Sequence, residues 1–149
     1  MIIILGYGNI LRGDDGVGVK IVQKLKAMCL PNHIRIIDGG SKGIDELINI
    51  EDFEKLIIID SVISGGKEGS LYRMTIPELP ETKNMDLSTH GSSWINFLKS
   101  KVESGEKGCW SKVVFYGIEI KNTLIRTELS PRIVNKMPEY LNSILEELQ

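Results

Sequence analysis

Apolar residues follow two patterns along the chain, short β-branched runs and longer segments with helical spacing. Five runs predict strands, at residues 2–5, 34–37, 56–59, 71–76 and 113–118. All but the run at 71–76 are continuously apolar, as expected for parallel strands that helices cover on both faces. The run at 71–76 mixes polar and apolar residues, and the connection before it is too short for a helical crossover. We therefore expect an antiparallel edge strand there.

The segments between these runs predict helices. The first starts near Asp14 and ends before Pro31, a short one covers residues 43–49, and the next begins near His90. The last helix has Ser130 as its N-cap and Pro131 at its first helical position, with Pro138 as a potential kink. The apolar faces of the first, third and last of these helices are Val17, Ile21, Leu25 and Met28; Trp94, Phe97, Leu98 and Val102; and Ile133, Met137, Leu141, Ile144 and Leu148.

This alternation of strands and helices predicts one α/β domain over residues 1–149, a three-layer αβα sandwich around a mixed five-stranded sheet with one antiparallel strand. Two long connections, at residues 77–89 and 119–129, are candidates for substrate contacts because long loops in compact domains are often functional.

Composition excludes several classes of protein. The 149 residues include 18 Lys and Arg against 20 Asp and Glu, so the chain lacks the excess of positive charge that is typical of nucleic-acid-binding proteins. Cys29 and Cys109 have no Cys-x-x-Cys spacing, which argues against a disulfide framework or a zinc ribbon. The chain start has no positive region, and no apolar stretch approaches the roughly 20 residues of a membrane span. We expect a cytoplasmic, monomeric protein.

The densest motif is the glycine-rich segment at residues 6–18, between the first strand and the first helix. A dinucleotide-binding fingerprint would need a third glycine where Leu11 stands. Asp14 and Asp15 would also repel a pyrophosphate at the start of the helix. The segment therefore argues against nucleotide binding. Asp14 alone also fits a helix cap.

Acidic residues follow three strands of the predicted sheet: Asp15 in the glycine-rich turn, Asp38 after the second strand and Asp60 after the third. Asp60 also fits an Asx turn. The carboxyl ends of parallel strands share one edge, so these acids should converge there. Converging carboxylates raise one another's pKa unless a cation balances them, which implies a metal or a cationic group. His90 would complete a set of transition-metal ligands, although a loop histidine is also commonly a surface residue.

These motifs together resemble the NiFe-hydrogenase maturation endopeptidases. The resemblance is carried by Gly-Asn-x-Leu-x-x-Asp-Asp-Gly-x-Gly at residues 8–18, Asp38-Gly39-Gly40, Ile59-Asp60, Thr89-His90 and Leu129-Ser130-Pro131. It implies a phosphorylase/hydrolase-like αβα sandwich. It also implies a protease that removes the C-terminal extension of a hydrogenase large-subunit precursor after nickel insertion.

The resemblance also assigns residues. It implies that Asp15, Asp60 and His90 bind the metal and form the catalytic site. The nickel belongs to the precursor, and other divalent metals can occupy the same ligands. The segment at residues 38–40, which consists of Asp38, Gly39 and Gly40, corresponds to recognition of the cleavage site. The remaining motif residues, which form the structural turn, are Gly8, Asn9, Asp14 and Gly16.

The chemistry of cleavage stays open at this stage. The sequence has no His-Glu-x-x-His helix, Gly-x-Ser-x-Gly elbow or papain-like cysteine. Either a carboxylate acts as general base, or the nickel polarises the carbonyl or the water. Other functions to weigh are a nickel-handling chaperone without proteolysis, a glycine-rich nucleotide-binding module, and a different metal-dependent or acid peptidase on the same fold.

Overall fold

The structure is a computed structural model that describes residues 1–149 except 42–43, 80–85, 88–90, 106–109 and 122. Its strands are β1 (Ile2–Tyr7), β2 (Ile34–Gly40), β3 (Lys55–Ile63), β4 (Leu71–Thr75), β5 (Asp86–Leu87) and β6 (Val113–Glu119). Its α-helices are α1 (Val17–Lys26), α2 (Asp45–Ile48), α3 (Gly91–Glu103) and α4 (Pro131–Glu147). Single 3-10 turns are η1 (Gly13–Gly16), η2 (Ile76–Glu78) and η3 (Trp110–Lys112).

The sheet has the order β2-β1-β3-β6-β4, in which β4 pairs with β6 in the antiparallel direction and the other neighbours are parallel. The predicted mixed five-stranded sheet and the antiparallel β4 at its edge are therefore confirmed. A sixth strand, β5, adds two residues antiparallel to β3 and lies in the predicted loop at 77–89.

The prediction that β2 is buried on both faces is wrong. This strand forms the other edge of the sheet, and Arg35 in its middle is exposed. An edge strand has a neighbour on one side only, so fewer of its side chains need to be apolar.

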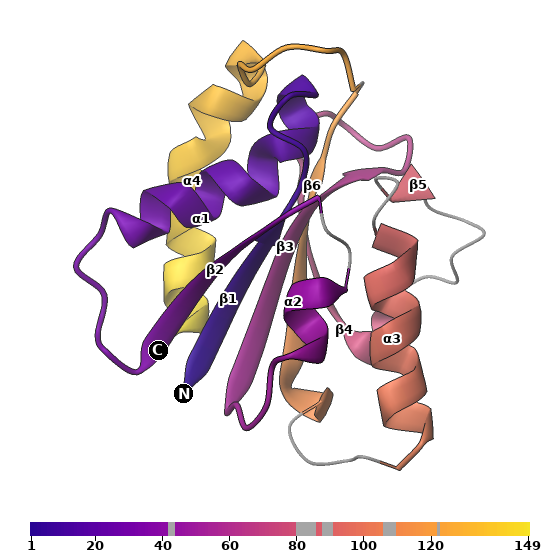
Figure 1. The fold of residues 1–149 in the computed structure, drawn as a ribbon. Coiled ribbons are helices and arrows are strands. Elements are labelled where there is room, and N and C mark those ends of the chain that lie inside the picture. The colour runs from indigo at the N-terminus through magenta and orange to yellow at the C-terminus, as the bar shows by residue number, and fades with distance from the viewer. Residues whose placement is uncertain (42–43, 80–85, 88–90, 106–109, 122) are drawn as a thin grey trace.

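Helices cover both faces of the sheet (Figure 1). The helices α1 and α4 pack on one face, where Ile21 and Ile133 join Ile57 of β3 in one cluster. On the other face α2 and α3 pack, and Trp94 joins Ile58 of β3. Alternate residues of β3 thus enter opposite cores, as the pleat requires. Together the elements form the predicted three layers.

Two details of the helix predictions are wrong. The first helix ends at Lys26, so Met28 lies outside it and is exposed, and Val102 of α3 is exposed as well. In contrast, α4 starts at Pro131 as predicted and continues through Pro138. Within the described part of the chain, none of the helices has the length and apolar character that crossing a membrane requires.

Candidate active site

Asp15 is buried in η1, immediately after the turn that follows β1. Its Oδ2 accepts the Asn9 backbone N–H at 3.0 Å, and its Oδ1 accepts the Ser61 hydroxyl at 3.1 Å. The turn depends on Gly8, which has a φ of 141° and where a Cβ would lie 2.2 Å from the Asp15 carbonyl oxygen. The glycine-rich motif therefore holds Asp15 at the carboxyl edge of the sheet, next to β3. Gly16 is buried in the same η1 turn.

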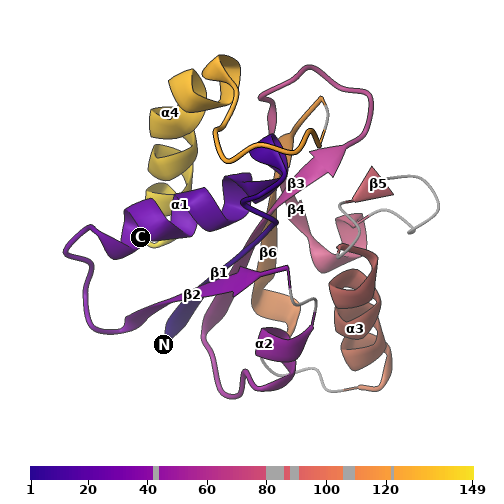
Figure 2. The ribbon, with the colours of Figure 1, turned by 45° about the horizontal axis from the view of Figure 1, so that its top comes forward.

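The neighbouring Asp14 has a different role. Its Oδ1 accepts the Ser130 backbone N–H at 2.6 Å, and its Oδ2 lies 3.6 Å from Arg126 Nη2. Figure 2 shows the segment before α4 passing beside the turn after β1, where an isolated parallel bridge pairs Arg12 with Arg126. The helix-cap role for Asp14 is wrong, because η1 separates it from α1, whose N-cap is Gly16. Asp14 instead ties the turn to the start of α4.

Asp60 is fully buried in β3. The strand continues to Ile63, so the expectation that Asp60 ends it is wrong. Its Oδ1 accepts the Ser61 backbone N–H at 2.8 Å, and its Oδ2 accepts the Trp94 indole N–H at 3.4 Å. Successive strand residues point to opposite faces, so Asp60 faces α3 while Ser61 faces Asp15. Ser61 thus contacts both candidate carboxylates.

Asp38 lies at the same edge of the sheet but in a separate environment. It is exposed, and its Oδ1 accepts the Gly40 backbone N–H at 3.0 Å. The Gly40 carbonyl in turn accepts the Gly8 N–H at 2.9 Å. Asp38 and Gly40 line a pocket of ≈ 260 Å³ with Gly8, Asn9, Ile10, Leu11, Val19 and Ser41. Because β2 continues to Gly40, the expectation that Asp38 ends this strand is wrong, and Asp38 is exposed where Asp15 and Asp60 are buried.

His90 lies outside the described residues, so the expected set of three ligands is not tested. Among the residues that the structure describes, no group of three His, Cys, Asp or Glu side chains is arranged to hold a metal. The geometry that the structure does describe is the contact of Asp15 and Asp60 with Ser61.

Several polar groups at this edge were not predicted from the sequence. Glu119 is buried at the end of β6, where its carboxylate accepts the Ser64 N–H at 3.0 Å, the Ser64 hydroxyl at 2.8 Å and the Gly66 N–H. The signal used for Asp60, a carboxylate after an apolar strand, also applies to Glu119. Ser61 carried no such signal, because a serine after an aspartate is unremarkable in sequence.

Tyr7 is a further buried polar residue at this edge. Burial raises the pKa of its phenol above the ordinary value, and the carboxylate of Asp60 raises the pKa further. The phenol therefore stays protonated at physiological pH.

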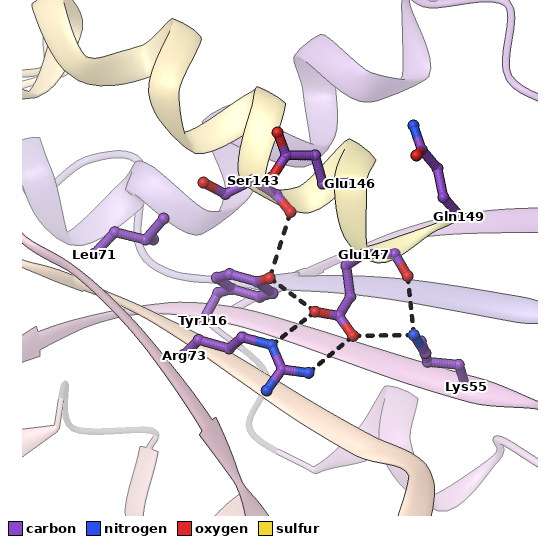
Figure 3. Close-up of a pocket in the computed structure, with 8 residues that line it drawn as sticks. All are labelled: Lys55, Leu71, Arg73, Tyr116, Ser143, Glu146, Glu147 and Gln149. Carbon is purple, nitrogen blue, oxygen red and sulfur yellow. Dashed lines mark hydrogen bonds and ion pairs between the residues drawn. The ribbon is translucent and has the colours of Figure 1, made fainter.

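A second charged pocket, of ≈ 470 Å³, lies toward the amino-terminal end of β3 (Figure 3). Glu147 accepts hydrogen bonds there from Lys55 at 2.9 Å, from Arg73 at 2.7 and 3.0 Å and from the Tyr116 hydroxyl at 3.0 Å. These partners lower the pKa of Glu147 to about 2. A carboxylate that two cations already neutralise is suited to fastening α4 to the sheet.

The fold and the buried carboxylates at its carboxyl edge can be compared with known proteins. A structure titled hydrogenase maturating endopeptidase HybD from Escherichia coli superposes with a TM-score of 0.83 at 25% identity, covering 99% of this chain and 91% of that chain. Another, the hydrogenase 2 maturation peptidase of a Thaumarchaeota archaeon, gives 0.72 at 28% identity, covering 99% and 97%. The fold is thus that of the maturation endopeptidases.

The amino-acid sequence gives the same result. The profile of the hydrogenase maturation protease family matches residues 19–147. A Methanocaldococcus jannaschii protein, provisionally named a hydrogenase maturation protease, is 30% identical over 99% of this chain and 96% of its own. The hydrogenase 2 maturation protease of Escherichia coli is 27% identical over 99% and 90%. This chain belongs to the hydrogenase maturation protease family.

Proposed function

We propose that this chain removes the C-terminal extension of a NiFe-hydrogenase large-subunit precursor after nickel insertion. In this proposal Asp15 and Asp60, together with His90, bind the nickel that the precursor carries. The observation that supports it most is that two buried carboxylates from distant parts of the chain contact one serine, Ser61.

The electrostatics of Asp15 support a cationic substrate group. Its partners in the described part of the chain are a backbone N–H and a hydroxyl, both neutral donors. Each oxygen of the carboxylate accepts one of these hydrogen bonds and keeps a further lone pair that could bind a metal ion. Because the site is buried, the charge of the carboxylate attracts a cation more strongly than it would in water.

Docking of the precursor at this edge would use the surface beside the glycine-rich turn. Leu11, Leu124 and Ile125 are exposed there, with 60%, 59% and 85% of their surface accessible. Leu124 and Ile125 lie in the predicted contact loop at 119–129, and backbone hydrogen bonds of the following residue, Arg126, with Leu11 and Gly13 hold this segment beside the turn. These exposed apolar residues, together with the pocket beside Asp38, fit a protein substrate.

In this proposal the nickel controls both the binding of the precursor and the time at which it is cleaved. A precursor without nickel would lack the group that Asp15 and Asp60 bind, so it would dock weakly and keep its extension. In a nickel-loaded precursor, docking places the scissile peptide bond at the carboxyl edge of the sheet. Hydrolysis there proceeds with a carboxylate as general base or with the nickel polarising the carbonyl or the water.

The test is the intact mass of a nickel-loaded precursor before and after incubation with this protein, beside a nickel-free precursor. We expect loss of a short C-terminal peptide only from the nickel-loaded sample. Asp15→Asn and Asp60→Asn should each abolish this loss while circular dichroism stays unchanged, and Glu139→Gln, on the exposed face of α4, should cleave normally.

Other results would change the proposal in defined ways. Cleavage of both samples would remove the nickel checkpoint. Nickel transfer without any mass change would indicate the chaperone function instead. Full activity in both aspartate variants would overturn the assignment of the site.

A further inference from the structure

The hydroxyl of Tyr7 is a buried polar group that the proposed mechanism does not yet use. Tyr7 ends β1 and has no accessible surface, and its hydroxyl accepts or donates no hydrogen bond within the described part of the chain. The other two buried tyrosines differ. Tyr140 donates to the Gly69 carbonyl at 2.6 Å, and Tyr116 donates to Glu147. A buried hydroxyl without a partner lowers stability, so its presence calls for a reason.

The ring of Tyr7 is fixed between the two parts of the candidate site. It stacks on Trp94 with centroids 6.4 Å apart and planes 11° apart, and the Trp94 indole donates to Asp60. The ring also packs so closely on Gly39 that a Cβ there would lie 2.8 Å from it. A side chain at position 39 would therefore clash with the Tyr7 ring.

The charges around the phenol define what it can do. Asp60 and, more weakly, Asp45 and Glu46 of α2 act on it electrostatically, and all three are acids. A phenol hydroxyl that lies near carboxylates is a hydrogen-bond donor to them. Of the three acids, Asp60 accepts the indole N–H of Trp94, on which the Tyr7 ring stacks, and it belongs to the candidate active site.

We propose that Tyr7 is a positioning residue, whose hydroxyl donates to the carboxylate of Asp60 once the precursor is bound. The bond from the Trp94 indole to Asp60 is long, at 3.4 Å, and catalytic hydrogen bonds commonly shorten when the substrate binds. With donors from Trp94 and Tyr7, Asp60 would present a fixed orientation to the nickel of the precursor. This inference rests on the proposed function.

The variant Tyr7→Phe tests it, because it removes the hydroxyl and keeps the ring. We expect the cleavage rate at saturating nickel-loaded precursor to fall about 10- to 100-fold, the usual worth of a hydrogen bond to a charged group. The precursor concentration for half-maximal rate should change less than about twofold, since docking uses other residues. The unfolding temperature should stay equal or rise, because the variant removes an unsatisfied polar group.

Tyr140→Phe is the matched control. It makes the same chemical change at a tyrosine whose hydroxyl donates to Gly69. Its unfolding temperature should fall, and its cleavage rate at a temperature where it is folded should match the wild type. The two variants thus separate a role in the reaction from a role in stability.

Two results would overturn the role of Tyr7: a wild-type cleavage rate in Tyr7→Phe, or a rate loss matched by a fall in the folded fraction. If the wild-type protein itself leaves the precursor uncut, the proposed function fails first. That failure is visible in the wild-type sample and is therefore distinct from failure of the Tyr7 inference.

Discussion

The two ends of the central sheet each hold a carboxylate, half-buried at one end and buried at the other, in surroundings of a different kind. Toward the amino-terminal end of β3, Glu147 is neutralised by Lys55 and Arg73. At the carboxyl edge, Asp15 contacts the Asn9 N–H and the Ser61 hydroxyl, both neutral. Both carboxylates accept hydrogen bonds, but among the described residues only Glu147 is paired with cations.

Pairing with cations is typical of a structural acid, whereas neutral hydrogen-bond donors leave an acid available as a metal ligand. An acid that is paired with cations in the folded chain gains nothing from a further cation, whereas an acid held by neutral donors keeps its charge for a substrate. The same contrast holds between neighbours in sequence, because Asp14 lies near Arg126 and Asp15 does not pair with a described cation.

The largest expected effect is on stability at the Glu147 end. Glu147→Gln removes the charge that Lys55 and Arg73 share and, because both cations are partly exposed, should lower the free energy of unfolding by about 2 kcal/mol. Urea denaturation measures this. The cleavage rate per folded molecule should not change, since the site lies at the other end of β3. Loss of cleavage in folded Glu147→Gln would contradict the conclusion that this end of the sheet has a structural role only.

The pH dependence of stability should have the same origin. The pKa of Glu147 is about 2 in the folded protein and 4.5 in its ordinary state. Its contribution is therefore fully present above pH 4.5 and is lost as the pH falls toward 2. Partial exposure of the cations reduces the effect, so we expect a loss of about 2 kcal/mol over that interval. Urea denaturation at several pH values should show that the free energy of unfolding depends less steeply on pH in Glu147→Gln than in the wild type. Equal slopes in the two proteins would contradict this role of Glu147.

The sequence was sufficient to predict the framework of both ends. The four parallel strands, the antiparallel β4 and the start of α4 at Pro131 follow from apolar runs and helix-start signals. These features depend on local pattern, which one sequence displays. The placement of Asp15 was also predictable, because glycine-rich turns after a first strand end at the carboxyl edge of the sheet.

The partners of the acids were not predictable in the same way. Ser61 reaches Asp15 across 46 positions, and Arg73 reaches Glu147 across 74. Contacts at such separation depend on strand register and on the crossing of helices. The distinction between Asp14 and Asp15, two identical neighbours in sequence, arises from η1, which turns one toward Ser130 and the other toward Ser61.

An intermediate effect is expected at Glu119, which is held by neutral donors as Asp15 is but accepts more hydrogen bonds, from Ser64 and Gly66. Glu119→Gln replaces one acceptor oxygen by an amide facing the Ser64 and Gly66 N–H groups, and should cost about 1–2 kcal/mol. Urea denaturation should detect this cost, while nickel-dependent cleavage continues. If Glu119→Gln abolished cleavage at full stability, Glu119 would join Asp15 and Asp60 as part of the active site.

The smallest effect is expected at Ser61. Ser61→Ala removes the hydroxyl donor to Asp15 but leaves the Asn9 N–H on Asp15 and the Ser61 N–H on Asp60. Stability should therefore fall by about 1 kcal/mol, the worth of one buried hydrogen bond. The cleavage rate should fall only a few-fold, because one of the two donors that orient Asp15 remains.

Ser64→Ala is the matched control for Ser61→Ala, since it removes a hydroxyl donor from Glu119 in the same way. It should lower stability by a similar amount and leave the cleavage rate unchanged. Equal losses of cleavage in the two serine variants would mean that Ser61 acts on stability alone. In that case the contact between Ser61 and Asp15 would be part of the framework, and the candidate site would contract to the two carboxylates themselves.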